Sequence, residues 1–133
     1  MAEIEGALAI TTQHDASGAV VLSVTGELDH YTGPALRQAV EEVLRTPGTG
    51  LIADLSGVQY CDSTGMTVII TTYHRAEAAG SPLVVAGLSP GLAELFRVAG
   101  LDQIFPLYPT VRDAVGAFRG TGGAPAPGGG LRH

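Results

Sequence analysis

After two opening β-branched segments, the chain alternates short apolar runs with longer stretches of helical periodicity, and this alternation constrains the fold most. Turn residues Asp15–Gly18 separate residues 7–13 from residues 19–25, which predicts an antiparallel hairpin. Further short apolar runs predict strands at Leu51–Leu55, Leu83–Ala86 and Ile104–Leu107. Strands that alternate with helices pair in parallel. The sequence therefore predicts an α/β fold with a mixed β-sheet of four to five strands.

Three of about four predicted helices have clear starts or stops. Pro34 suits the first turn of one helix, and Thr46-Pro47-Gly48 ends it. Ser89-Pro90 opens another as N-cap and first-turn proline. Thr110 with Asp113 resembles a capping box. Apolar residues in steps of three and four predict the buried faces, namely Leu36, Ala39, Val40, Val43 and Leu44; Leu92, Leu95, Phe96 and Ala99; and Val111, Ala114, Val115 and Phe118.

Residues 64–79 carry conflicting signals. Their centre, Thr67–Thr72, is β-branched, so local propensity favours a strand. Length and the Gly80-Ser81-Pro82 stop favour a helix, with a stripe formed by Met66, Ile69, Ile70 and Tyr73. We predict a helix.

Composition bounds the domain and its partners. The 133 residues suffice for one domain, which we place at residues 1–119. Residues 120–133 are rich in Gly and Pro and are predicted to form a disordered tail. Net charge is −6, and the seven Lys and Arg side chains are scattered, which argues against nucleic acid as a partner.

Cysteine content and hydropathy point to a compartment. The single Cys61 excludes an internal disulfide and fits a reducing environment. No leader pattern and no apolar stretch of about 18 residues is present, so neither a leader nor a membrane span is predicted. We expect a cytoplasmic protein that does not bind membranes.

The segment Asp62-Ser63-Thr64-Gly65 follows a predicted strand and begins a predicted helix. Several backbone N–H groups lack partners at such a position, and Asp62 or Ser63 can cap one of them. Capping alone is a sufficient structural reason for these residues. The same helix end also tolerates an anion, so a phosphate on Ser63 would alter the surface and leave the fold intact.

A second polar segment, Gly26–Thr32, is predicted to be a loop that leaves the sheet beside the first. Neighbouring parallel strands end at one edge of a sheet, so Asp29 and Asp62 are expected to lie near each other. A solvated loop without function is the plainer interpretation of Glu27 and Asp29. If functional, Asp29 should matter for binding or phosphorylation more than for folding.

These segments, together with Ala86-Gly87-Leu88-Ser89-Pro90 and Leu95–Leu101, resemble the anti-sigma-factor antagonists of the STAS domain family (sulfate transporter and anti-sigma antagonist). The resemblance runs from about residue 7 to residue 118. It implies a STAS-like sheet with helices and a phosphoacceptor serine after an aspartate, which is Ser63 here. Thr64, where the family often has Ser, is a candidate minor acceptor.

The family's function would transfer as follows. Unphosphorylated antagonist captures an anti-sigma factor with a histidine-kinase-like ATP fold and frees a sigma factor for transcription. Phosphorylation by that kinase ends the capture, and a serine phosphatase restores it. The resemblance assigns partner binding to Asp29, His30, Asp62, Ser63, Thr64, Gly65 and Met66. We expect a monomer or weak dimer. The alternative is a STAS partner-binding subunit of a transport or stress-signalling complex.

Other kinds of site find little support. A hydrolase would need Ser63 as nucleophile and a histidine base, and only His30 is expected nearby; no Gly-x-Ser-x-Gly elbow surrounds Ser63. The lone Cys61 and the histidine spacing argue against zinc, and no Walker-type phosphate loop is present. We therefore predict a non-enzymatic protein without cofactor or metal.

Overall fold

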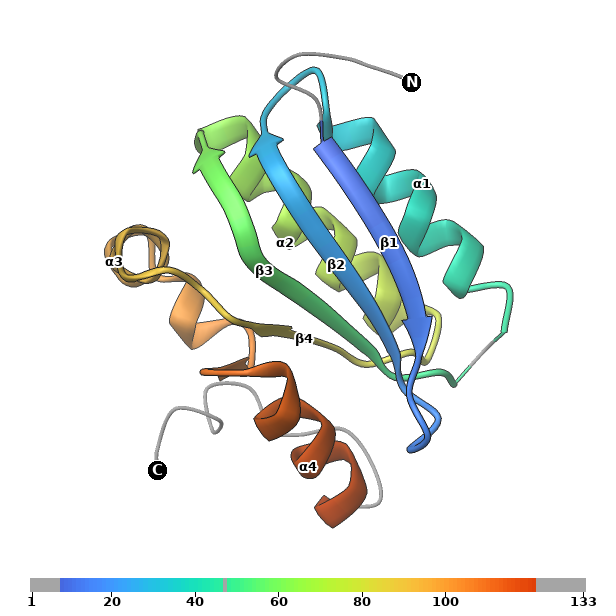
Figure 1. Ribbon diagram of the computed structural model, residues 1–133. Coiled ribbons are helices and arrows are strands. Elements are labelled where there is room, and N and C mark those ends of the chain that lie inside the picture. The colour runs from blue at the N-terminus through green and yellow to red at the C-terminus, as the bar shows by residue number, and fades with distance from the viewer. Residues whose placement is uncertain (1–7, 47, 122–133) are drawn as a thin grey trace.

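The computed structural model describes residues 8–46 and 48–121, and its five strands form one sheet in the order β1-β2-β3-β4-β5 (Figure 1). The first two strands pair antiparallel, and every later pair is parallel. The predicted mixed α/β sheet is confirmed. The strands are β1 (Leu8–His14), β2 (Val20–Leu28), β3 (Leu51–Cys61), β4 (Leu83–Ala86) and β5 (Leu107–Tyr108).

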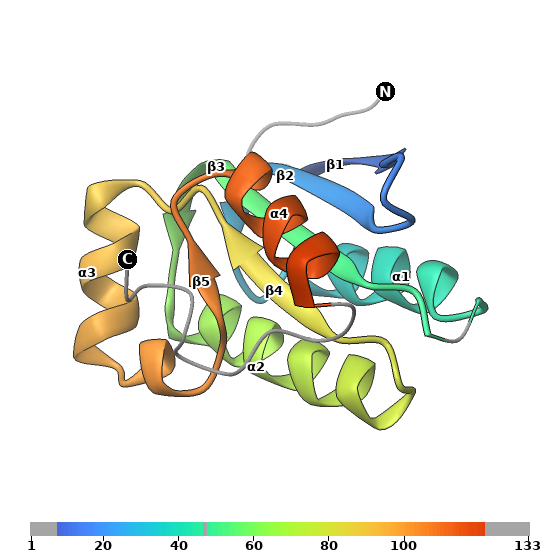
Figure 2. The same cartoon turned by 90° about the horizontal axis from the view of Figure 1, so that it is seen from below.

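Helices cover both faces of the sheet (Figures 1 and 2). Helices α1 (Gly33–Val43) and α2 (Ser63–Ala78) lie on one face, and α4 (Val111–Thr121) lies on the other. Helix α3 (Pro90–Val98) stands beside the sheet, next to the end of β3. Among the described residues, no helix combines the length and the apolar character needed to cross a bilayer.

Two apolar clusters hold these layers together. The larger lies between the sheet and helices α1, α2 and α3, and includes the fully buried side chains of Leu22, Leu51 and Phe96. The smaller lies under α4, where Ala114 packs near Ile52 and Val84. Burial of such side chains contributes about 1.5–3 kcal/mol each, which fixes the orientation of every strand that reaches the site described below.

Strands β2 and β3 are longer than predicted. The expected strand end at Leu55 is wrong, because Ser56 and Gly57 continue β3 as far as Cys61. Gly26, Glu27 and Leu28 likewise belong to β2 and not to the predicted loop. The pairing register shifts at two places in this region, between Ser23 and Thr25 and between Gly26 and Glu27. These irregular pairs accommodate the glycines, which in sequence had suggested turns.

Helix predictions were right in type but partly wrong in face. Residues 64–79 are helical as predicted, and Ser89 caps α3 as predicted, with its Oγ accepting from the Leu92 N–H. The predicted burial of Leu95 and Ala99 is wrong, since both are exposed. On α2 the buried face includes Val68 and Thr72, while the predicted Met66 and Ile70 are only partly buried.

The end of the domain also differs in detail. A short 3-10 helix, Leu101–Gln103, precedes β5, which begins at Leu107 instead of Ile104. The predicted capping pair is present, because the Thr110 hydroxyl donates to Asp113 and accepts from its backbone N–H. Helix α4 continues to Thr121, past the expected boundary at residue 119. The remainder of the predicted tail, residues 122–133, lies outside the described residues.

Candidate functional site

The first turn of α2 presents the predicted phosphoacceptor. Asp62 is the N-cap, in an extended backbone conformation, and its Oδ1 accepts a hydrogen bond from the Gly65 N–H at 2.8 Å. Ser63 is the first helical residue, and both Ser63 and Thr64 are exposed. The capping function of Asp62 is therefore real. It leaves the Ser63 side chain at the protein surface, beside the positive end of the helix dipole.

Gly65 allows this turn to sit against the sheet. A Cβ at this position would overlap the carbonyl oxygen of Leu28 and would lie 3.0 Å from the Cys61 Sγ. The same turn is secured by the Met66 N–H, which donates to the Asp62 carbonyl at 2.9 Å. Gly65 thus serves close packing, which places Ser63 at a fixed position relative to the ends of β2 and β3.

Asp29 organises the connection from β2 to α1. Its Oδ1 accepts hydrogen bonds from the Tyr31 N–H at 2.9 Å and the Thr32 N–H at 3.0 Å. The Thr32 Oγ1 in turn accepts from the Asp29 N–H at 3.0 Å and donates to the Glu27 carbonyl. This network makes Asp29 a structural residue as well as a surface one, which the sequence did not indicate.

The two aspartates follow residues that are paired in the sheet. Leu28 and Cys61 are partners at the ends of β2 and β3, and Asp29 and Asp62 come next along each strand. The Asp62 N–H donates to the Leu28 carbonyl at 3.4 Å, so the two connections leave the sheet side by side. The two aspartates therefore follow neighbouring strand ends, and Ser63 follows Asp62 directly.

Cys61 is the last residue of β3 and is buried. Burial, with a further contribution from the neighbouring Asp62 carboxylate, raises the pKa of its thiol to about 11. A thiol with this pKa is neutral near pH 7 and therefore a poor nucleophile. Cys61 supports the site by packing.

Two exposed aromatic residues, which were not predicted from the sequence, lie close in the chain to Asp29 and Asp62. Tyr31 is 85% exposed and Tyr60 is 52% exposed, which are high values for such large side chains. His30 is exposed too, and its ring meets that of Tyr31 edge-to-face at 5.3 Å. In the sequence, the available signal for Tyr31 and Tyr60 was an aromatic residue next to a polar turn. Exposed Tyr side chains are typical of protein-binding surfaces.

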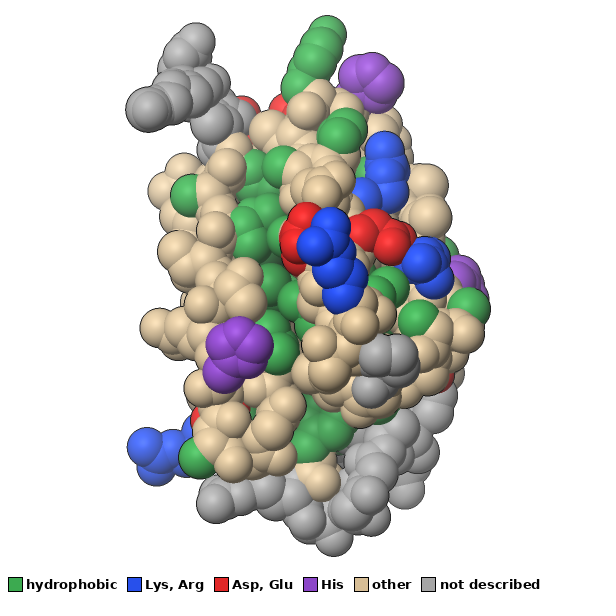
Figure 3. Space-filling view, turned by 90° about the vertical axis from the view of Figure 1, so that its right-hand side faces the viewer, with side chains coloured by type: hydrophobic (Ala, Val, Ile, Leu, Met, Phe, Trp, Pro, Cys, Tyr) green, Lys and Arg blue, Asp and Glu red, His purple; other side chains and the backbone are tan. Residues whose placement is uncertain are grey.

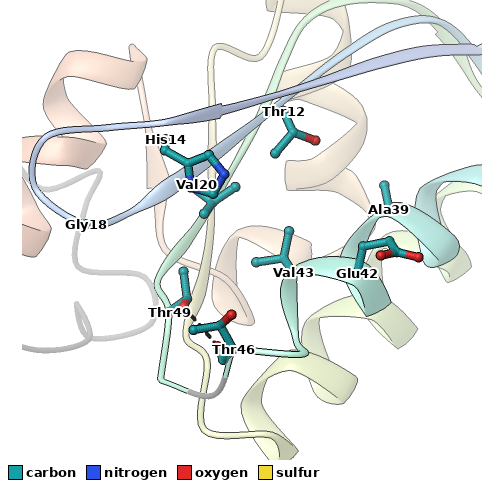
Figure 4. Close-up of a pocket in the computed structure, with 9 residues that line it drawn as sticks. All are labelled: Thr12, His14, Gly18, Val20, Ala39, Glu42, Val43, Thr46 and Thr49. Atoms are coloured by element: carbon teal, nitrogen blue, oxygen red, sulfur yellow. Dashed lines mark hydrogen bonds between the residues drawn. The ribbon is translucent and has the colours of Figure 1, made fainter.

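A separate hollow of about 460 Å³ lies between β1 and α1 (Figure 4). Figure 3 shows the molecule from this side. His14 and Glu42 stand on its opposite walls, and the Glu42 carboxylate bonds to Gln38 and pairs with Arg45. His14 pairs with Val20, at the other end of β2 from Leu28, so this hollow is remote from Ser63. No three His, Cys, Asp or Glu side chains gather to hold a metal ion within residues 8–46 and 48–121.

Comparison with known proteins gives a consistent result. The sequence pattern named STAS domain matches residues 8–114. The anti-sigma-F factor antagonist RsfB of Mycobacterium tuberculosis is 35% identical over 109 residues, which cover 82% of this chain and 88% of RsfB.

Solved structures share the fold. An anti-sigma factor antagonist from Mycobacterium paratuberculosis superposes with a TM-score of 0.77 at 33% identity, covering 89% of this chain and 99% of that one. The Bacillus protein SpoIIAA in its phosphorylated form gives a TM-score of 0.61 at 20% identity, covering 80% and 96% of the two chains. The second likeness concerns the fold alone.

Proposed function

This chain belongs to the STAS domain family, and we propose that it is an anti-sigma factor antagonist whose capture of an anti-sigma factor is switched off by phosphorylation of Ser63. The curated relatives are anti-sigma factor antagonists, so an anti-sigma factor is the partner class to expect. The proposed phosphorylation switch rests on one observation: Ser63 is exposed at the first position of α2, directly after the capping Asp62.

The position of Ser63 suits a modification that changes binding without unfolding. A phosphoserine carries about −1.5 to −2 charges at neutral pH. The positive end of α2 offsets part of the repulsion from the neighbouring aspartates by about 0.3–1 kcal/mol. Asp62 already caps the helix through Gly65, so the Ser63 hydroxyl is not needed for the fold.

At a partner surface fitted to a neutral hydroxyl, the same phosphate would be unfavourable. A single like-charge contact at about 4 Å costs about 1 to 4 kcal/mol, depending on the local dielectric. A loss of about 2.7 kcal/mol weakens binding roughly a hundredfold. Local repulsion and desolvation are therefore sufficient for a switch, and the domain does not have to change shape.

The proposal assigns each participant a task. Asp29, His30, Asp62, Ser63, Thr64, Gly65 and Met66 form the partner surface, with Gly65 acting through packing. The partner is an anti-sigma factor with a histidine-kinase-like ATP fold, which phosphorylates Ser63. A serine phosphatase removes the phosphate and restores capture. The sigma factor is free while the unphosphorylated antagonist holds the anti-sigma factor.

Two baits test this function. Ser63→Ala and Ser63→Asp proteins are used for affinity capture from the native host, followed by mass spectrometry. The Ser63→Ala bait should retain an anti-sigma factor that the Ser63→Asp bait loses. The captured protein, purified and supplied with ATP, should phosphorylate the wild type at Ser63. Equal capture by both baits, or phosphate mapped mainly to Thr64, contradicts the proposal.

A further inference from the structure

Strand β3 is paired on both sides for only part of its length. Residues 51–54 pair with β2 and with Leu83–Ala86 of β4. From residue 55 to residue 61, the pairing recorded within the described part of the chain is with β2 alone. The Ser56 N–H already donates to Asp54 Oδ1 at 3.1 Å, so the free edge of β3 is formed by residues 57–61, and Figure 1 shows β4 diverging from it. A free edge offers backbone donors and acceptors to an added strand.

An apolar groove of about 330 Å³ lies between this free edge and α3. Its buried lining includes Val58 and Cys61 from β3 and Leu92 from α3. The exposed lining includes Tyr60, which is 52% exposed, and Leu95, which is 44% exposed. None of the residues that line the groove is charged, so it suits a neutral, apolar occupant.

The groove is continuous with the candidate switch. Cys61 lines the groove, Asp62 follows it as the cap of α2, and Ser63 is the next residue. A chain that lies along the last residues of β3 therefore ends within two residues, along the sequence, of Ser63. Because the groove and Ser63 adjoin in the chain, we take the anti-sigma factor that phosphorylates Ser63 as the occupant of the groove.

We infer that the anti-sigma factor docks in this groove, adding an extended segment to the free edge of β3 and inserting an apolar side chain between Tyr60 and Leu95. The inference rests on the proposed function and supplies its anchoring contact. Backbone pairing contributes affinity that depends little on sequence, while the groove selects the side chain. A phosphate on Ser63 would then lie at the end of the bound segment. Binding would partly remove its hydration shell, which costs free energy.

Two variants on one helix test the groove. Leu95→Asp places a charge on its wall, whereas Val98→Asp places the same charge on α3 at a site that is 70% exposed and outside the groove lining. Binding of the purified anti-sigma factor is measured by calorimetry with the 133-residue chain, after circular dichroism has verified both folds. Leu95→Asp should weaken binding at least tenfold, and Val98→Asp less than threefold. Equal effects of the two variants overturn the inference.

Hydrogen exchange tests the added strand. Peptides that cover residues 56–61 should exchange more slowly in the complex than in the free chain, and unchanged exchange overturns strand addition. Analytical ultracentrifugation of the chain alone tests a second copy as occupant; self-association that Leu95→Asp abolishes overturns the choice of partner. Failure of the proposed function differs from all of these, because wild type and Ser63→Asp would then bind the anti-sigma factor equally or not at all.

Discussion

Gly65 in the first turn of α2 packs directly against Leu28 at the end of β2, so closely that an added Cβ would lie 2.9 Å from the Leu28 carbonyl carbon. Backbone on backbone leaves no flexible side chain that can move aside. The contact joins the helix that carries Ser63 to the strand that leads into Asp29. The positions of the two polar segments are therefore coupled through one residue.

This contact predicts opposite effects for two glycine substitutions. Gly65→Ala should lower the free energy of unfolding by about 1–3 kcal/mol, because the methyl group overpacks against Leu28. Gly116→Ala, in α4 where an added Cβ would meet open space, should raise it by about 0.5–1 kcal/mol through helix propensity. Urea denaturation of both variants measures the difference, and equal shifts would contradict the packing role of Gly65.

The hydrogen bonds of Asp29 predict that its carboxylate oxygen, apart from its charge, stabilises the fold. Asp29→Ala leaves the Tyr31 and Thr32 N–H groups without their acceptor and should cost about 1–2 kcal/mol. Asp29→Asn keeps an oxygen and should cost less than half as much. Thermal unfolding compares the two. Any loss of partner binding in Asp29→Asn then reports the charge and not the fold.

Cys61 predicts a loss of stability at alkaline pH. Its folded pKa of about 11 lies above the ordinary thiol value of 9.0, so the unfolded chain releases the proton first as pH rises. The contribution is fully present below pH 9 and is lost between pH 9 and pH 11. The free energy of unfolding should fall by about 1–2 kcal/mol over this range, after allowance for solvent screening. Cys61→Ala should flatten the curve there, and an unchanged slope would contradict the assignment.

Local switching predicts a confined spectroscopic change. Phosphorylation of Ser63 should alter backbone chemical shifts near the start of α2 and in the neighbouring connection around Asp29, while β4, β5 and α4 stay unchanged. The reason is that Asp62 caps the helix independently of the Ser63 side chain. Shift changes that spread to α4 would show a global rearrangement and rule out the local mechanism.

Residues 122–133 should be dispensable for partner binding, because a segment rich in Gly and Pro offers a partner little apolar surface. A chain that ends at Thr121 should bind the anti-sigma factor within twofold of the 133-residue chain in calorimetry. A tenfold loss would place these residues in the interface.

Alternating apolar runs and helical stripes were sufficient to predict the order and type of the main elements. Strand ends were not predictable, because Gly26 and Gly57 look like turn residues in sequence but lie inside irregular β pairing. Helical periodicity also placed Leu95 in the core, although α3 stands beside the sheet and has too few neighbours to cover that face. Neighbouring elements decide burial, and periodicity alone does not reveal them.

The candidate site was predictable to a similar degree. Asp62-Ser63 at a helix start follows from local rules of capping, so the sequence was enough to identify it. The hydrogen bonds of Asp29, the free edge of β3 and the exposure of Tyr31 and Tyr60 depend on how distant segments meet. These features required three-dimensional information.

The close packing of Gly65 against Leu28 affects how a kinase would recognise Ser63. The start of α2 is held by a strand distant in the chain, because Gly65 packs against Leu28 and the Asp62 N–H donates to the Leu28 carbonyl. A short synthetic peptide spanning Gln59–Met66 would lack the strand partner that holds the helix start in place, and isolated turns of this length are not helical in water. Under the proposed function, the kinase would recognise a folded epitope and not a linear motif, so searches of peptide libraries would miss its specificity.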